Sequence, residues 1–342
     1  MGDVPLVAGP RCDRFTKPAA LRFRLGTQAD LETCAALLPA GFRASPAVRS
    51  RLVDLWRRLL ETEARTFAII EDIERKHPDN IEAFGMSVFV KDRFVETFCA
   101  APHPYPTATL YEQLLAGDEP VLTSQELLDA NSTEGINIVG VHFGSRNEDV
   151  TDGRTAQVLA TASAAFYFFH GGFRVKCFLN EVYGAQPAAY MEAGGFRLVH
   201  DFQRQDPAAF ANVPPPQYPY LFMLRREWSL PGAVNPLSML FATATPRLHF
   251  SATERRLLER ALLNESDLEI GNDLGISTDS VKKTWRTIYD RVRRHAPYII
   301  PASDTDSASG RGREKRRHLL EYLRTHLEEL RPAKLPSTLR KG

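Results

Sequence analysis

Hydrophobic positions follow two different periods along the first two thirds of the chain. Short segments rich in β-branched and aromatic residues indicate strands at residues 21–25, 66–73, 83–90, 136–143, 175–182, 196–202 and 218–225. Between them, hydrophobic residues recur with a helical period at residues 29–38, 46–62, 107–130, 154–170 and 187–193. Strands that alternate with helices in this way predict an α/β domain over residues 21–230.

The pattern changes beyond this domain. Residues 231–246 contain three prolines and several small residues, which predicts a linker. Residues 247–300 follow only the helical period and predict an all-α domain. A second linker, rich in Ser, Asp and Gly, is expected at 301–312, before an amphipathic helix and tail at 313–342. Residues 1–20 are expected to form a flexible N-terminus.

Three helix starts are marked in the second domain. Ser251 with Glu254, and Ser266 with Glu269, have the S-x-x-E spacing of a capping box. In this motif the Ser oxygen accepts a hydrogen bond from the first turn while the Glu reaches back to the cap. Ser277 is a third candidate N-cap. Helices are therefore expected to begin near residues 252, 267 and 278.

Two residues predict where the first two of these helices end. Asn264 and Gly275 both tolerate the left-handed backbone conformation that is common after a helix. The second helix is then short, Asp267–Leu274, and the turn at 275–277 leads into a third helix over residues 278–294. Helices joined by such a turn are typical of a helix-turn-helix.

The third helix has an apolar side and a basic side. The apolar side is expected to complete a core made of Leu257, Leu258, Leu262, Leu268, Ile270, Leu274, Ile276, Val281, Trp285, Ile288 and Val292. The other side carries the candidate DNA-binding residues Thr278, Ser280, Lys282, Lys283, Arg286, Thr287 and Arg293. Lys and Arg can donate to guanine in the major groove, and hydroxyls can donate to phosphates. The alternative is a helical bundle whose basic side is only solvated.

The run FSATERRLLERALLNESDLEIGNDLGISTDSVKKTWRTIYDRV, residues 250–292, resembles the helix-turn-helix of the LuxR family. It shares that family's S-x-x-E-I segment, L-x-I-S turn, V-K pair and I-Y pair. It departs from the family pattern at Asn264, Gly271, Ser280 and Thr284. The resemblance implies that double-stranded DNA is a partner, with base contacts from Lys282, Lys283 and Arg286.

The last amphipathic helix has two interpretations. Its apolar side consists of Leu319, Leu320, Leu323, Leu327 and Leu330. This side either packs back on the protein or forms a homodimer, as in regulators that read two half-sites. The helix starts with the basic residues Arg311, Arg313, Lys315, Arg316 and Arg317. These residues are expected to add phosphate contacts in either case.

Charge is unevenly distributed along the chain. Residues 246–342 hold 20 of the 43 Lys and Arg and 14 of the 42 Asp and Glu, a net charge of +6, against −5 for the remainder. This asymmetry fits a polyanionic partner for the C-terminal third. The chain shows no membrane-spanning apolar run, no secretory signal and no metal-binding spacing among its four cysteines. A cytoplasmic bacterial protein without a membrane partner or metal site is expected.

The order of elements in the first domain resembles the GNAT acetyltransferase fold. LRFRLGTQADLETCAALL, residues 21–38, is similar to that family's first strand and helix. AAYMEAGGFRLVHDF, residues 188–202, is similar to its last helix and the strand that follows. The resemblance implies a mixed sheet with flanking helices. It also implies a glycine-containing loop that holds the pyrophosphate of acetyl-CoA at a helix N-terminus.

The chemistry of that loop is missing from the corresponding segment, HFGSRNEDVTDGRTAQ, residues 142–157. Its glycines are scattered, and three acidic residues are expected to repel phosphate: Glu148, Asp149 and Asp152. Arg146 and Arg154 compensate only in part. The family's catalytic Tyr falls on Met191, one residue from Tyr190.

Glu181 and Tyr183 follow a predicted strand, where they either face a pocket or simply pack. We therefore expect a degenerate GNAT-like domain with no catalytic residue and no cofactor. Such a domain either binds an altered ligand or serves as a scaffold.

Together these patterns predict a transcriptional regulator that reads the major groove of DNA with residues 278–294. A small-molecule effector or a partner of the α/β domain would control it. The alternative is an acyl-CoA-dependent N-acyltransferase with an appended helix-turn-helix. A third hypothesis is a protein-interaction module whose helical domain does not bind DNA.

Overall fold

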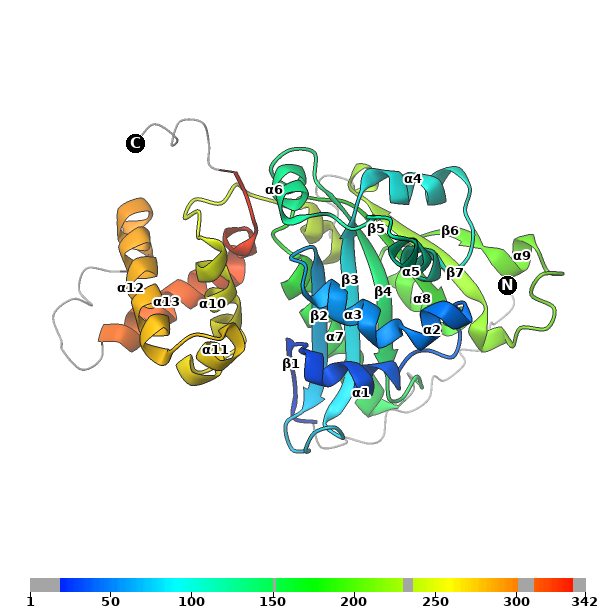
Figure 1. Cartoon of the computed structure of the whole chain (residues 1–342), viewed down its shortest axis with the longest axis horizontal. Coiled ribbons are helices and arrows are strands. Elements are labelled where there is room, and N and C mark those ends of the chain that lie inside the picture. Colours follow the sequence, from blue (N-terminus) through cyan, green and yellow to red (C-terminus); the bar gives the residue numbers. More distant parts are fainter. Residues whose placement is uncertain (1–18, 150–151, 230–235, 301–310, 335–342) are drawn as a thin grey trace, which may run out of the picture.

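The protein consists of an α/β domain and a helical domain that lie beside each other (Figure 1). The computed structural model describes residues 19–149, 152–229, 236–300 and 311–334. Residues 1–18 of the expected flexible N-terminus and residues 301–310 of the expected linker lie outside these residues. Within the other expected linker, Leu240 is fully buried in the core of the α/β domain.

A seven-stranded mixed sheet forms the centre of the α/β domain. Its strands are β1 (Leu21–Leu25), β2 (Arg65–Asp72), β3 (Ile81–Val90), β4 (Ile136–Ser145), β5 (Val175–Tyr183), β6 (Arg197–Asp201) and β7 (Pro219–Arg225). They lie in the order β1-β2-β3-β4-β5-β7-β6. Strands β4 and β5 are parallel, and all other neighbours are antiparallel. The predicted mixed sheet with flanking helices is confirmed.

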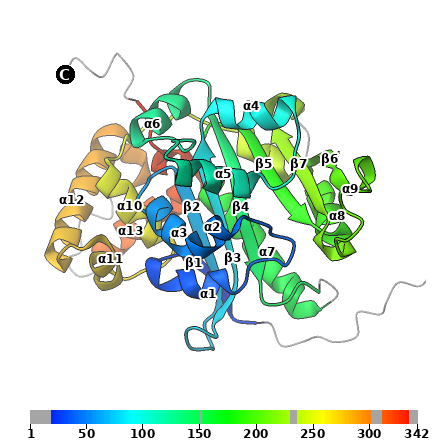
Figure 2. The ribbon, with the colours of Figure 1, turned by 45° about the vertical axis from the view of Figure 1, so that its right-hand side comes forward.

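Helices cover both faces of this sheet (Figure 2). They are α1 (Leu31–Ala35), α2 (Pro46–Ser50), α3 (Leu52–Leu60), α4 (Asp92–Ala100), α5 (Pro106–Ala116), α6 (Ser124–Ser132), α7 (Gly153–His170), α8 (Ala185–Ala193) and α9 (Phe202–Gln205). Successive side chains of a strand point to opposite faces. Phe67 of β2 therefore shares a core with Trp56 of α3, whereas Ala68 packs with Ala165 of α7 on the other face.

Several helical segments differ from the predictions, and the one expected over residues 107–130 is also two helices, α5 and α6. The helix expected over residues 46–62 is two helices, because the backbone at Arg51 leaves the helical conformation. The helix expected over 29–38 is a single short one, α1, that follows a 3-10 turn. Helix α4 was not predicted, although Phe94, Val95 and Phe98 bury one side of it.

The helical domain contains α10 (Ala252–Leu262), α11 (Asp267–Leu274), α12 (Thr278–His295) and α13 (Arg311–Thr325). Ser251 and Ser266 form the predicted capping boxes at the starts of α10 and α11. Asn264 and Gly275 have φ angles of 64° and 65°, the left-handed conformation expected after each helix. The local sequence signals therefore set the helix boundaries in this domain.

The core of this domain contains most of the predicted side chains. Those that are buried are Leu257, Leu258, Leu262, Ile270, Val281, Trp285, Ile288 and Val292. Leu274 and Ile276 are partly buried against them. The prediction for Leu268 was wrong, because its side chain is 63% exposed. It lies two residues before Ile270, and two residues along a helix point to nearly opposite sides.

Helix α13 packs against the rest of the helical domain. This is the first of the two alternatives that the sequence analysis gave for its apolar side. Leu319, Leu320 and Leu323 are buried in the same core as α10 and α12. The outward side of α13 is polar and includes the exposed residues Arg317 and Arg324. The apolar side of α13 is therefore used within the chain.

We expect Leu323→Ala to lower the free energy of unfolding by about 2–4 kcal/mol, because it leaves a cavity where the side chain is fully buried. Urea denaturation followed by circular dichroism measures this loss, with exposed Arg324→Ala as the control. If α13 instead held a dimer together through this residue, the size of the loss would depend on protein concentration.

Candidate functional site

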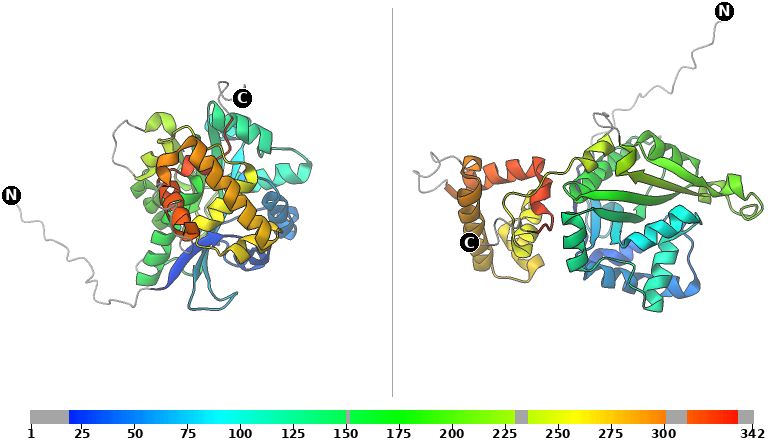
Figure 3. Two further views of the ribbon diagram at one scale, coloured as in Figure 1. Left: turned by 90° about the vertical axis from the view of Figure 1, so that its left-hand side faces the viewer. Right: turned by 90° about the horizontal axis from the view of Figure 1, so that it is seen from above.

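Helix α12 lies on the side of the helical domain that faces away from the sheet (Figures 1 and 3). Its first turn is fixed by Ser277, whose Oγ accepts a hydrogen bond from the Ser280 N–H at 3.2 Å. Val281, Trp285 and Ile288 bury one side of the helix against α10 and α11. The other side is therefore open to solvent along the length of the helix.

The predicted DNA-binding residues lie on this open side or at its edge. Those that are exposed are Lys282, Lys283, Arg286, Thr287 and Arg293. Thr278 and Ser280, in the first turn, are half-buried. The Ser280 hydroxyl lies 2.9 Å from that of Ser277, so it already has a partner within the cap.

Only some of these cations have a partner within the chain. Lys282 lies 3.4 Å from Asp279 with its side chain 60% exposed, a weak surface pair. Arg293 pairs with Asp290. Among the residues that the structure describes, neither Lys283 nor Arg286 has an ion-pair partner. The middle of α12 thus presents an uncompensated positive charge to solvent.

Arg316 of α13 has a structural role that the sequence did not reveal. Its guanidinium lies 2.7 Å from the Asp267 carboxylate and 4.5 Å from the centre of the Trp285 ring. The Trp285 N–H also donates to Asp267 at 3.3 Å. This contact joins α11, α12 and α13, and it engages Arg316, which the sequence suggested as a phosphate contact.

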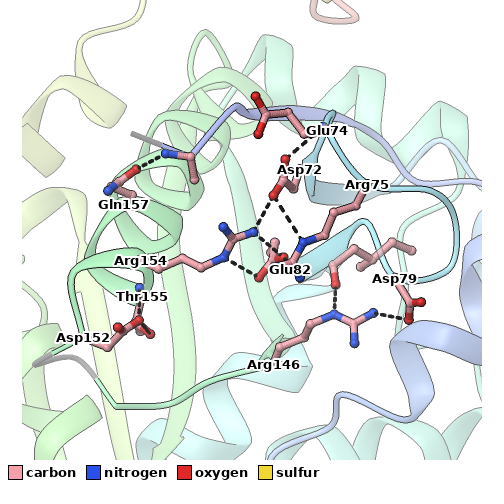
Figure 4. Close-up of polar contacts among 12 residues, drawn as sticks. Asp72, Glu74, Arg75, Asp79, Glu82, Arg146, Asp152, Arg154, Thr155 and Gln157 are labelled. Atoms are coloured by element: carbon pink, nitrogen blue, oxygen red, sulfur yellow. Dashed lines mark hydrogen bonds and ion pairs between the residues drawn. The ribbon is translucent and has the colours of Figure 1, made fainter. Parts of the chain in front are cut away.

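At the start of α7, where the resemblance to the GNAT fold implies a pyrophosphate site, side chains of the protein itself form the polar contacts (Figure 4). Asp152 caps α7, and its carboxylate accepts a hydrogen bond from the Thr155 N–H at 2.9 Å. Arg154 lies 2.6 Å from Asp72 and 2.7 Å from Glu82. Both carboxylates are almost fully buried, and Arg154 and Arg75 serve as their counter-ions. An incoming phosphate would meet the Asp152 carboxylate at this helix N-terminus.

Arg146, the other cation expected to favour phosphate, is turned toward the β2–β3 loop (Figure 4). It donates to the carbonyls of Ile81 and Pro78. A shallow pocket of about 440 Å³ lies beside it, lined by Arg75, Lys76, Asp79 and Arg146. Both arginines of the predicted segment are thus committed to the fold.

Strands β4 and β5 diverge, and α5 bridges the gap between them. Their parallel pairing runs from Ile136–Val175 to Gly140–Asn180 and then stops. Beyond that point Thr107 donates to the carbonyl of Val141 at 3.1 Å. The Tyr105 N–H donates to Glu181 at 2.7 Å. The sequence predicted helix in this insertion but did not indicate that its first turn bridges the sheet.

Glu181 is the most perturbed acid among the described residues of this gap. Burial raises the pKa of its carboxyl to about 7, although the Tyr105 N–H and the Tyr183 hydroxyl both stabilise the charged form. The Tyr183 hydroxyl donates to Glu181 at 2.8 Å. Glu181 and Tyr183, which the sequence analysis singled out, therefore lie at the end of β5 and contact each other. Tyr190, in contrast, is 49% exposed on α8.

Two further observations limit the chemistry of the described residues. No group of three or more His, Cys, Asp or Glu side chains in them is arranged to hold a metal ion. None of their helices combines the length and the apolar character needed to cross a bilayer.

No protein-family model and no curated relative matches the sequence. Solved structures similar to the chain include a mutant of the spermidine N-acetyltransferase SpeG from Vibrio cholerae (12% identity, TM-score 0.34) and NAA60 from Arabidopsis thaliana in complex with acetyl-CoA (15%, 0.37). The C-terminal condensation domain of Ebony, in complex with beta-alanyl-dopamine, is another (9%, 0.33). Each match covers 60% of this chain and 94–99% of the other. At these values the matches assign neither an activity nor a ligand.

We expect Glu181→Gln to change how stability depends on pH. The folded-state pKa of about 7 exceeds the usual 4.5, so the unfolded chain releases this proton first as pH rises. The wild type therefore loses about 3 kcal/mol from this group between pH 4.5 and pH 7, and no more above that. Urea unfolding at pH 5 and pH 8 should show a smaller loss in Glu181→Gln than in the wild type. Glu192→Gln, at an exposed position of α8, is the control, and equal losses in all three proteins would contradict the assignment.

Proposed function

We propose that the protein binds double-stranded DNA through α12 and acts as a transcriptional regulator. The observation that carries the proposal is the open basic side of α12, which follows α11 through the Gly275–Ser277 turn. An α-helix fits the major groove of B-DNA, and in a helix-turn-helix the second helix enters it. The α/β domain would then receive a signal from a small-molecule effector or a partner protein.

The positions along α12 suggest a division of roles. Lys283 and Arg286 lie near the middle of the open side, and neither has a carboxylate partner in the part of the chain that the structure describes. Both are therefore available to donate to guanine O6 and N7. Lys282 and Arg293 have exposed acidic partners that a phosphate would displace. Thr278 at the helix start and Thr287 beside Arg286 would contact phosphates. Ser280 would have to release its contact with Ser277 to do so.

An acyl-CoA-dependent N-acyltransferase is the second candidate. Glu181 favours it, because a carboxyl with a pKa of about 7 in a gap between diverging strands suits a general base. Asp152 and the committed guanidinium of Arg154 oppose it, because both disfavour a pyrophosphate at the start of α7. We therefore place DNA binding first.

A selection from a random duplex library tests the leading proposal. We expect the wild type to enrich one sequence motif, and Lys283→Ala/Arg286→Ala to lose it with a ~100-fold or larger drop in affinity. Arg256→Ala/Arg324→Ala removes the same charge from exposed positions outside α12 and should keep the motif. Retention without a motif would reduce the interaction to salt-dependent electrostatics. No retention of the wild type at low salt would refute the proposal.

Calorimetric titration with acetyl-CoA tests the second candidate. We expect no saturable heat, since the N-terminus of α7 is already capped by a carboxylate. Saturable binding together with acetylation of an amine would instead favour the acyltransferase. Glu181→Gln should then abolish turnover while leaving acetyl-CoA binding intact.

A further inference from the structure

The segment that follows α13 lies against both domains. We refer to residues 327–334 as the C-terminal strap. On the helical side, Leu330 is buried in the domain core, and the Glu329 carboxylate accepts hydrogen bonds from the backbone N–H groups of Arg247 and Leu248 at 2.9–3.1 Å. Tyr322 of α13 also donates to Glu329. One half of the strap is therefore part of the helical domain.

The other half of the strap binds the α/β domain. Asn131 of α6 donates to the carbonyl of Pro332 at 2.7 Å, and the Lys334 N–H donates to the Ser132 hydroxyl at 2.8 Å. The Lys334 ammonium lies 2.8 Å from Asp129. Gly172 lets the strap approach closely, because a Cβ atom there would lie 2.3 Å from the Glu328 nitrogen.

Arg331 is the central contact of the strap. Its side chain is only 4% exposed. It donates to the carbonyls of Gly171 at 2.8 Å and Phe168 at 2.5 Å, at the C-terminal end of α7. It also lies 3.4 Å from Glu259 of α10 and 4.6 Å from the centre of the Phe173 ring. One guanidinium thus joins α7 of the first domain to α10 of the second.

A guanidinium suits this position better than an ammonium does. The unpaired carbonyls at a helix C-terminus carry a partial negative charge, which attracts a cation. The planar fork of Arg can meet two carbonyls and a carboxylate at once while it stacks on a ring. Lys keeps the charge but is a compact point donor, so it cannot replace all of these contacts.

The direct contact between the domains is small without the strap. In its apolar part Leu263 of the helical domain packs against Ala68, Ala165 and Phe169 of the α/β domain. Arg65 of β2 is half-buried there near Glu259 and Arg260, and its buried Nε has no hydrogen-bond partner among the described residues. A buried donor left unsatisfied lowers stability. The strap therefore provides most of the favourable polar contact between the domains.

We propose that the strap is an interdomain latch through which the α/β domain regulates the helical domain. Helix α7 connects the Asp72–Arg154–Glu82 contact at its first turn to Arg331 at its last. A change in the α/β domain that moves α7 is then passed through Arg331 to α10 and the helices packed on it. The consequence for DNA rests on the proposed function, whereas the latch itself does not.

Hydrogen exchange of the full-length protein tests the latch without DNA. We expect Arg331→Lys to raise exchange ~10-fold or more at residues 168–175 and 129–134, with an increased radius of gyration by X-ray scattering. Lys334→Glu, which disturbs only an exposed pair, should give a smaller change in the same segments. Arg324→Ala, outside the strap, should give none. Unchanged exchange and radius in Arg331→Lys would overturn the latch, whether or not the protein binds DNA.

The duplex enriched in the selection tests the coupling. Binding linkage is reciprocal, so DNA on α12 should alter exchange at residues 168–175 of the wild type. In Arg331→Lys the duplex should still protect α12 but no longer affect residues 168–175. An effect of DNA on residues 168–175 that persists in Arg331→Lys, or is missing from a wild type that binds the duplex, would overturn the coupling. Failure of the wild type to bind any duplex would refute the proposed function and, with it, this regulatory role. The exchange measured without DNA would still show whether the strap holds the two domains together.

Discussion

Arginine side chains compensate negative charge at both ends of helix α7. At its start, Arg154 pairs with Asp72 and Glu82, two carboxylates that would be strongly destabilising if buried alone, and Arg75 is the second cation that pairs with both. At its end, Arg331 satisfies carbonyls that a buried helix terminus would otherwise leave unpaired. The first contact attaches α7 to β2 and β3, and the second attaches the helical domain to α7. Helix α7 therefore takes part both in the α/β domain and in the contact between the domains.

The same contacts bear on how the start of α7 could receive an anion. A helix N-terminus attracts phosphate when its N–H groups are free and no anion is nearby. Here the Asp152 carboxylate occupies that position, and the charge of Arg154 is directed to buried acids. The gap between β4 and β5 is bridged by hydrogen bonds from Tyr105 and Thr107. The contacts of Asp152 and Arg154 that stabilise this domain thus disfavour a phosphate at the start of α7.

The sequence predicted the helical domain closely because its signals are local. A capping box or a left-handed Asn involves residues within one or two turns of each other, so Ser251, Asn264 and Gly275 could be read directly. The strands of the sheet were also predicted, since each is a short segment rich in β-branched and aromatic residues. What the sequence could not supply were contacts between distant segments. Nothing near Arg316 or Arg331 in the chain indicates Asp267 or Gly171 as a partner.

Errors on single side chains have the same origin. Leu268 fits the composition of a core helix, but the direction in which α11 packs leaves it exposed. Glu181 was visible as a polar residue after a strand, whereas its raised pKa depends on the burial that α5 creates. The exposure of most of the predicted DNA-binding residues could be anticipated without a distant partner, because the helical period of α12 alone separates them from Val281, Trp285 and Ile288.

The structure divides the cationic side chains of the helical domain into those with a carboxylate partner and those without one among the described residues. The sequence analysis did not distinguish these two groups. Arg291, Arg316 and Arg331 have carboxylate partners within the chain, so their charges are accounted for by the fold. Lys283 and Arg286 contribute nothing comparable to folding, and like charges on one side of a helix repel each other. A helix retains such a surface at a small loss of stability. Neutralisation by a polyanion removes that repulsion. The difference between cations that have a carboxylate partner and cations that have none among the described residues supports α12 as the proposed DNA-binding element more strongly than net charge does.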